Sequence, residues 1–80
     1  MKIKIIFFAE LREIFGSHRH LEIAEGQKVS HVSDLLAEES ARFLEKQKSL
    51  RYAVNEDFVA PERTLRDKDC LAILMPMSGG

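Results

Sequence analysis

Apolar and polar residues alternate at the start of the chain. Lys2 and Lys4 fall on one side of an extended backbone, whereas Ile3 and Ile5 fall on the other. This two-residue period predicts a strand over residues 2–8 with one buried face.

Two shorter patterns follow this strand. Residues 9–15 carry apolar side chains at helical spacing, and Gly16 is placed to end a short helix there. Residues 18–24 alternate again and predict a second strand, and residues 25–28 have the composition of a turn.

The longest predicted element is a helix that begins at Ser30 or His31. Apolar side chains recur there at intervals of three and four, which places them on one buried stripe: Val32, Leu35, Leu36, Phe43 and Leu44. We therefore expect one long helix whose stripe packs against a sheet.

Three strand-like segments complete the chain, at residues 51–55, 58–60 and 70–75. The order is then strand, strand, helix, strand, short strand, strand. An α+β fold with one main helix across one face of a mixed sheet of about five strands satisfies this order. It is the β-grasp, or ubiquitin-like, arrangement, in which the first and last strands are parallel neighbours. We expect this domain over residues 1–75 and a flexible C-terminal tail over residues 76–80.

The sheet face that the helix cannot cover carries apolar residues. Strand parity places Ile6, Phe8, Ala72 and Leu74 on this outer face, with Phe58 near enough to join them. An open apolar patch on so small a domain predicts a protein partner. The pattern is equally compatible with a loop that folds over the patch, or with burial of residues 5–8 on both sides.

The charge balance excludes some partners. Lys and Arg total 12 and Asp and Glu total 13, so the formal net charge is −1. No basic excess points to nucleic acid or to an anionic membrane, and no run approaches the roughly 20 apolar residues of a membrane span. The single cysteine, Cys70, cannot form an internal disulfide, which favours a reducing, cytoplasmic location.

Two of the four glycines, Gly79 and Gly80, are the last two residues. Glycine has no Cβ, so a nucleophile can approach a terminal glycine carbonyl freely and the slim chain end can enter a narrow tunnel. Pro76 would stiffen the root of the tail by fixing φ. Adenylation of the carboxylate would make it an acyl donor. From composition alone, a frayed chain end without function is a slightly better explanation of Gly79 and Gly80 than an acyl donor.

Other reactive side chains carry weaker signals. His18 and His20 lack a Cys or acidic cluster at ligand spacing, so a solvated strand face explains them better than a metal site. Cys70 lies in a strand with no base identified nearby, as expected of a packing residue. We therefore predict no metal site, no bound cofactor and no self-contained catalytic set.

Three segments together resemble the MoaD/ThiS family of β-grasp sulfur carriers, and in particular its molybdopterin synthase branch. They are the FFA-x-x-RE-x-x-G segment over residues 7–16, Ala-Val-Asn over residues 53–55, and residues 65–80 with the Gly-Gly end. The usual Asp-Gly-Asp-Glu turn is Asp-Lys-Asp-Cys at residues 67–70, and the tail has one proline fewer than usual.

The resemblance implies a mechanism. A MoeB-like, ATP-dependent enzyme adenylates Gly80, sulfur replaces oxygen to give a thiocarboxylate, and Gly79 keeps the end accessible. The tail then enters the active site of a MoaE-like large subunit, where it donates sulfur to cyclic pyranopterin monophosphate for molybdenum cofactor biosynthesis.

The resemblance also implies partner-facing residues and an assembly. The family's partner-facing positions match Phe8, Phe58 and Leu74, and the arginine of the first segment matches Arg12. We also count Pro76, at the root of the tail, as a partner-binding residue. The expected assembly is a heterotetramer with a small subunit at each end. Three alternatives remain open. They are a ThiS-like carrier for thiamin or another pathway, a ubiquitin-like modifier that links Gly80 to lysines, and a plain β-grasp interaction domain that does not need Gly79 and Gly80.

Overall fold

The computed structural model describes residues 1–76. Its elements are, in chain order, β1 (Lys2–Phe7), α1 (Glu10–Phe15), β2 (His18–Glu22), α2 (Val29–Glu39), α3 (Ala41–Lys46), η1 (Gln47–Ser49), β3 (Arg51–Val54), β4 (Asp57–Val59) and β5 (Cys70–Leu74). Of the predicted tail, Pro76 alone falls within the described residues.

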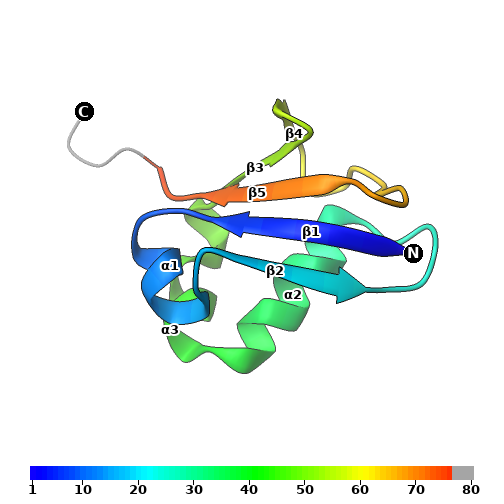
Figure 1. Ribbon diagram of the computed structural model, residues 1–80. Coiled ribbons are helices and arrows are strands. Elements are labelled where there is room, and N and C mark those ends of the chain that lie inside the picture. The colour runs from blue at the N-terminus through cyan, green and yellow to red at the C-terminus, as the bar shows by residue number, and fades with distance from the viewer. Residues whose placement is uncertain (77–80) are drawn as a thin grey trace.

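The five strands form one mixed sheet in the order β2-β1-β5-β3-β4. β1 and β5 are parallel, with Lys4 opposite Cys70 and Phe7 opposite Ile73, and the other neighbours are antiparallel. The arrows of β1 and β5 accordingly point the same way in Figure 1. The predicted β-grasp fold, with the first and last strands side by side in the centre, is confirmed.

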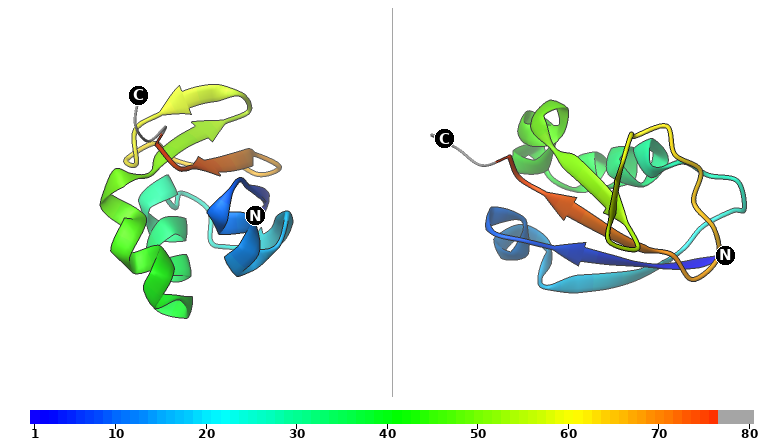
Figure 2. Two further views of the ribbon diagram at one scale, coloured as in Figure 1. Left: turned by 90° about the vertical axis from the view of Figure 1, so that its left-hand side faces the viewer. Right: turned by 90° about the horizontal axis from the view of Figure 1, so that it is seen from above.

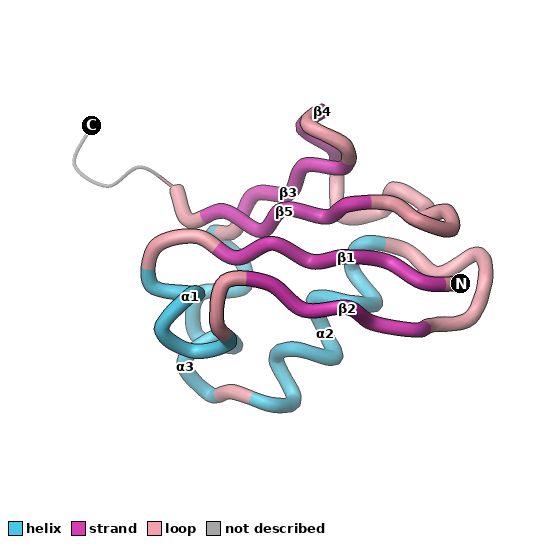
Figure 3. The backbone as a smooth tube through the Cα atoms, viewed as in Figure 1, coloured by secondary structure: helices cyan, strands magenta, loops and turns pink. Residues whose placement is uncertain are grey.

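The helices lie on one side of the sheet (Figures 1, 2 and 3). Alternate residues of the central strands point toward them and are fully buried: Ile3, Ile5, Phe7, Leu71 and Ile73. Val32 and Leu36 of α2 and Phe43 of α3 pack into the same core. The predicted inner face of the first strand is therefore the core face.

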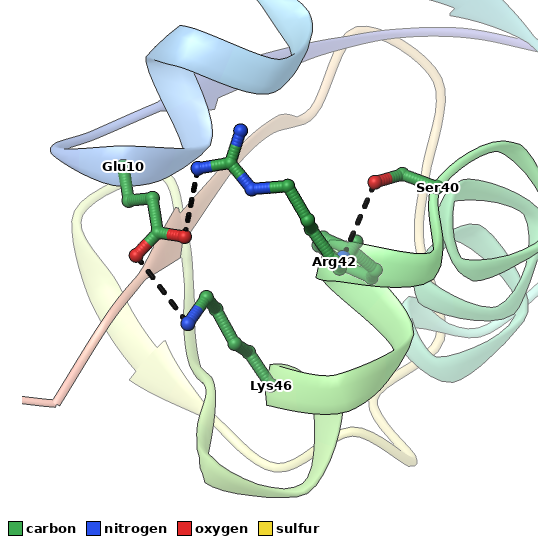
Figure 4. Close-up of polar contacts among 5 residues, drawn as sticks. Glu10, Ser40, Arg42 and Lys46 are labelled. Atoms are coloured by element: carbon green, nitrogen blue, oxygen red, sulfur yellow. Dashed lines mark hydrogen bonds and ion pairs between the residues drawn. The ribbon is translucent and has the colours of Figure 1, made fainter.

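The prediction of one long helix is wrong. The backbone is extended at Ser40, with φ −145° and ψ 120°, and separates α2 from α3. The Ser40 hydroxyl accepts a hydrogen bond from the Phe43 amide at 3.2 Å (Figure 4), which is the usual N-cap interaction. After this break Phe43 is buried, whereas Leu44 is 58% exposed and does not belong to the stripe.

The first strand ends one residue earlier than predicted, at Phe7. Ala9 has a positive φ of 50°, which turns the chain into α1, and the Leu11 amide donates to the Phe8 carbonyl at 3.0 Å. Gly16, with φ 91°, ends α1 as expected. Phe8 therefore lies in the connection between β1 and α1 rather than in the sheet.

An ion-pair cluster joins α1 to α3. Glu10 accepts from Arg42 at 2.9 Å and lies 3.3 Å from the Lys46 ammonium (Figure 4). The hydrogen bond from Arg42 is the main reason that the pKa of Glu10 is lowered. Next to this cluster the rings of Phe15 and Phe43 meet edge to face at 5.5 Å, so polar and apolar contacts both hold α1 in place.

Candidate functional site: the outer face of the sheet

The outer face of the sheet is lined by a row of small and apolar residues. Ile6 is opposite Ala72, Ala72 is opposite Ala53, and Ala53 is opposite Phe58, so the row crosses four strands. Ala53 is buried, but Phe58 is 71% exposed. Among residues 1–76 no helix covers this face, because α1, α2 and α3 all lie on the other side (Figure 2).

We call the set Ile6, Phe8, Phe58, Ala72 and Leu74 the outer patch. Its two aromatic rings are the most exposed members, at 41% for Phe8 and 71% for Phe58, while the three aliphatic members are partly exposed. Within residues 1–76 no loop closes over Phe8 or Phe58, and Ile6 is partly exposed. The patch predicted from strand parity is therefore open within the described residues.

Two shallow hollows indent the patch. One, of about 440 Å³, brings together three predicted site residues, Phe58, Leu74 and Pro76, and is completed by Arg51 and Met75. The other, of about 540 Å³, contains Phe8 and is lined by Ile6, Phe8, Asn55, Glu56, Cys70 and Ala72. Ala72 and Leu74 lie two residues apart on β5, so the hollows are neighbours.

Arg12 stands apart from both hollows. It is an exposed residue in the last turn of α1 and does not line either hollow. Gly79 and Gly80 lie outside the described residues, as do Met77 and Ser78.

A hydrogen-bonded network fixes one edge of the site. Asn55 donates from its side chain to Asp69 at 3.0 Å and accepts from the Cys70 amide at 3.0 Å. The other Asp69 oxygen accepts from the Arg66 amide at 2.8 Å, so the buried carboxylate is satisfied. Two of the segments that carry the family resemblance are thus joined here.

The sequence analysis missed two charged residues of the site. Glu56 lines the hollow around Phe8, and Arg51 lines the hollow around Phe58. Arg51 could have been found from strand parity, which places it on the same face as Ala53; in the structure it pairs with Leu74. Glu56 had no comparable signal, since a turn residue has no strand parity.

The remaining candidates form no evident reaction centre. His18 and His20 stack edge to face at 5.7 Å, and Cys70 is partly exposed in β5. Among residues 1–76 no three His, Cys, Asp or Glu side chains gather as a metal site would require. None of the helices described there has both the length and the hydrophobicity needed to cross a membrane.

The fold and its open sheet face define a ubiquitin-like β-grasp protein. The model of the ThiS family matches residues 5–80. The chain is also 36% identical to the molybdopterin synthase sulfur carrier subunit of Chlamydomonas reinhardtii, over all of both chains. It is 35% identical to the Escherichia coli K12 protein of the same name, over 98% of this chain and 99% of the relative. The chain therefore belongs to the ThiS family of sulfur carriers, in which MoaD-type proteins are included.

Solved structures agree with this fold. A putative molybdopterin converting factor subunit 1 from Pyrococcus furiosus has a TM-score of 0.83 at 23% identity, with 96% of this chain and 99% of that chain covered. A chain in a Helicobacter pylori complex of molybdopterin-converting factor subunits 1 and 2 has a TM-score of 0.70 at 18% identity over all of both chains. The small archaeal modifier protein 1 of Methanosarcina acetivorans has a TM-score of 0.78 at 26% identity, with 99% and 96% covered.

Proposed function

We propose that this protein is the sulfur-carrier small subunit of a molybdopterin synthase. One observation carries the proposal: the similarity to two sulfur carrier subunits of that enzyme covers nearly the whole chain in both cases. The family match also extends to residue 80 and so includes the Gly-Gly end.

The proposed chemistry takes place at Gly80. A MoeB-like enzyme joins the Gly80 carboxylate to AMP from ATP, and pyrophosphate leaves. Sulfide (HS⁻) then attacks the carbonyl carbon, the bond to the phosphate oxygen breaks and AMP leaves, and loss of the remaining S–H proton gives the thiocarboxylate. Gly79 contributes a narrow, unbranched approach to the carbonyl. The thiocarboxylate then donates sulfur to cyclic pyranopterin monophosphate in the large subunit's active site.

The outer patch supplies the docking surface in this proposal. Phe8, Phe58 and Leu74 are the apolar contacts, and Pro76, which shares a hollow with the last two, marks where the tail leaves for the partner's active site. Arg12 contacts the partner from α1 at the edge of the surface. The partner is a MoaE-like large subunit, and two subunits of each kind form a heterotetramer.

Mass spectrometry tests the core of the proposal. The protein is incubated with a MoeB-like enzyme, ATP and a sulfide source. We expect the mass of the intact chain to rise by the difference between sulfur and oxygen, and fragmentation to place that change on Gly80. A chain that never exchanges oxygen for sulfur would contradict the proposal.

A matched variant isolates the role of the carboxylate. Adding one alanine after Gly80 moves the carboxylate away from glycine but leaves residues 1–76 unaltered. We expect thiocarboxylate formation to be lost while the unfolding transition stays unchanged. Normal sulfur loading of the extended chain would rule out chemistry at Gly80.

Protein modification is the second candidate function, because the structure of the archaeal modifier at 26% identity aligns with nearly the whole chain. A modifier would leave Gly-Gly remnants on lysines of target proteins, which peptide mass spectrometry detects after digestion. A ThiS-like carrier for thiamin would instead co-purify with a thiazole synthase. Recovery of a MoaE-like subunit without such remnants favours the first proposal.

A further inference from the structure

The hairpin between β3 and β4 contains a residue in an unfavourable conformation. Val54 and Asp57 are paired, so the turn consists of Asn55 and Glu56 alone, and both have positive φ angles, 51° and 73°. Such a two-residue turn favours Asn at its first position and Gly at its second. Asn55 fits this rule, whereas Glu56 has a Cβ where glycine is preferred.

No group within residues 1–76 pairs with the Glu56 carboxylate. The side chain is exposed, and among the described residues it accepts no hydrogen bond and forms no ion pair. Lys4 is on the same face, opposite Cys70, but it does not line the hollow that Glu56 lines. A strained backbone at a residue whose carboxylate has no partner among residues 1–76 points to a role in binding.

The position of Glu56 indicates what it would bind. The hollow of about 540 Å³ has apolar walls from Ile6, Phe8 and Ala72, and among residues 1–76 Glu56 is the one charged residue that lines it. An apolar surface that ends in a carboxylate complements a side chain with an aliphatic stem and a cationic head. Lys and Arg have this form, and an opposite charge across an interface supports specificity.

We propose that Glu56 is a specificity-determining residue of the docking surface. It pairs with a Lys or Arg side chain that the partner protein inserts into the hollow beside Phe8. This inference rests on the proposed function, since it takes the large synthase subunit as the protein that covers the outer patch. It adds an electrostatic requirement to a contact that would otherwise be apolar.

Titration calorimetry with the purified large subunit of the same organism tests the pairing. We expect Glu56→Gln to weaken binding about tenfold at low ionic strength. We expect the difference to shrink as salt is added, because screening weakens the wild-type ion pair.

Asp57→Asn is the matched control. Asp57 is also exposed and acidic. It pairs with buried Val54, so strand parity places it on the opposite face of the sheet from the outer patch. Its removal should leave the affinity within about twofold.

A second variant separates binding from folding. Glu56→Gly removes both the carboxylate and the strain, so it should raise the denaturation midpoint and still weaken binding about tenfold. Higher stability together with weaker binding would show that the loss of affinity does not come from unfolding. Unchanged affinity and salt dependence in Glu56→Gln would contradict this inference alone. Failure of the wild-type chain to bind the large subunit would contradict the proposed function as well.

Discussion

Asn55 links the end of β3 to the start of β5 through both its backbone and its side chain. Its amide donates to the Cys70 carbonyl at 2.9 Å, and its side chain bonds both Asp69 and the Cys70 amide. We expect Asn55→Ala to lower the free energy of unfolding by about 2 kcal/mol. The substitution removes two hydrogen bonds, and alanine has no polar side chain to stabilise a positive φ as asparagine does. Urea denaturation measures the change.

Asn55→Gly is the control for this prediction. Glycine also lacks the side-chain hydrogen bonds but tolerates the positive φ of 51°, so it should cost less than alanine. Equal stability of the alanine variant and the wild type would show that the network around Asp69 does not stabilise the fold.

Tyr52 gives the fold a dependence on alkaline pH. Burial raises the pKa of its hydroxyl above the ordinary value of 10.0, and the hydroxyl lies 2.7 Å from the Ser33 hydroxyl in the core. Because the folded pKa is the higher one, the associated stability is fully present below pH 10.0 and is lost as the pH rises through the folded pKa. Tyr52 is the one tyrosine of the chain, so ultraviolet absorbance of tyrosinate follows it alone.

The titration compares the native protein with the same protein in urea. We expect the native tyrosine to ionise at higher pH than the unfolded one, together with a fall in stability above pH 10.0. In Tyr52→Phe this part of the fall should disappear. Coincident titration curves for the folded and unfolded protein would contradict the assignment.

At the scale of elements, the break at Ser40 decides how the helical layer packs. Ser40→Ala removes the side chain that accepts from the Phe43 amide, and we expect a loss of about 1 kcal/mol in the free energy of unfolding. Ser40→Asp keeps an oxygen acceptor and should recover most of this loss. Thermal denaturation of the three proteins checks the order, and equal stability of Ser40→Ala and the wild type would contradict the cap.

The break also shows where a periodic pattern stops being informative. Leu36 and Phe43 are seven residues apart and both buried, as one continuous helix would predict, yet they lie on α2 and α3. Only Leu44, exposed against expectation, distinguishes the two cases. Strand parity was more reliable because a side chain must point to one face or the other, and it placed Ile6, Ala72 and Leu74 on the outer face correctly.

At the scale of the whole molecule, the contacts between distant segments could not be predicted from local sequence patterns alone. The parallel pairing of β1 with β5 joins residues more than sixty positions apart, and it followed from the known β-grasp arrangement rather than from periodicity. The same is true of Phe58, whose place beside Leu74 depends on how β4 folds back on β3. Glu56 could not be placed at all without the geometry of the turn.

Phe58 and Leu44 are the most exposed large apolar residues among residues 1–76, and they lie on opposite layers, so they offer a direct test of which side binds. Phe58, 71% exposed, lies on the outer sheet face, and Leu44, 58% exposed, lies on α3. Phe58→Thr keeps the strand propensity and Leu44→Gln keeps the helix propensity. Because neither side chain is in the core, both variants should retain the stability of the wild type to within about 0.5 kcal/mol.

Binding to the large synthase subunit should separate the two variants. Removing an exposed aromatic ring that anchors an interface costs about 2 kcal/mol, or roughly thirtyfold in affinity, so Phe58→Thr should bind that much more weakly in calorimetry. Leu44→Gln should bind like the wild type, because the sheet lies between α3 and the outer patch (Figure 1). The reverse result, with Leu44 required and Phe58 dispensable, would move the docking surface to the helical layer.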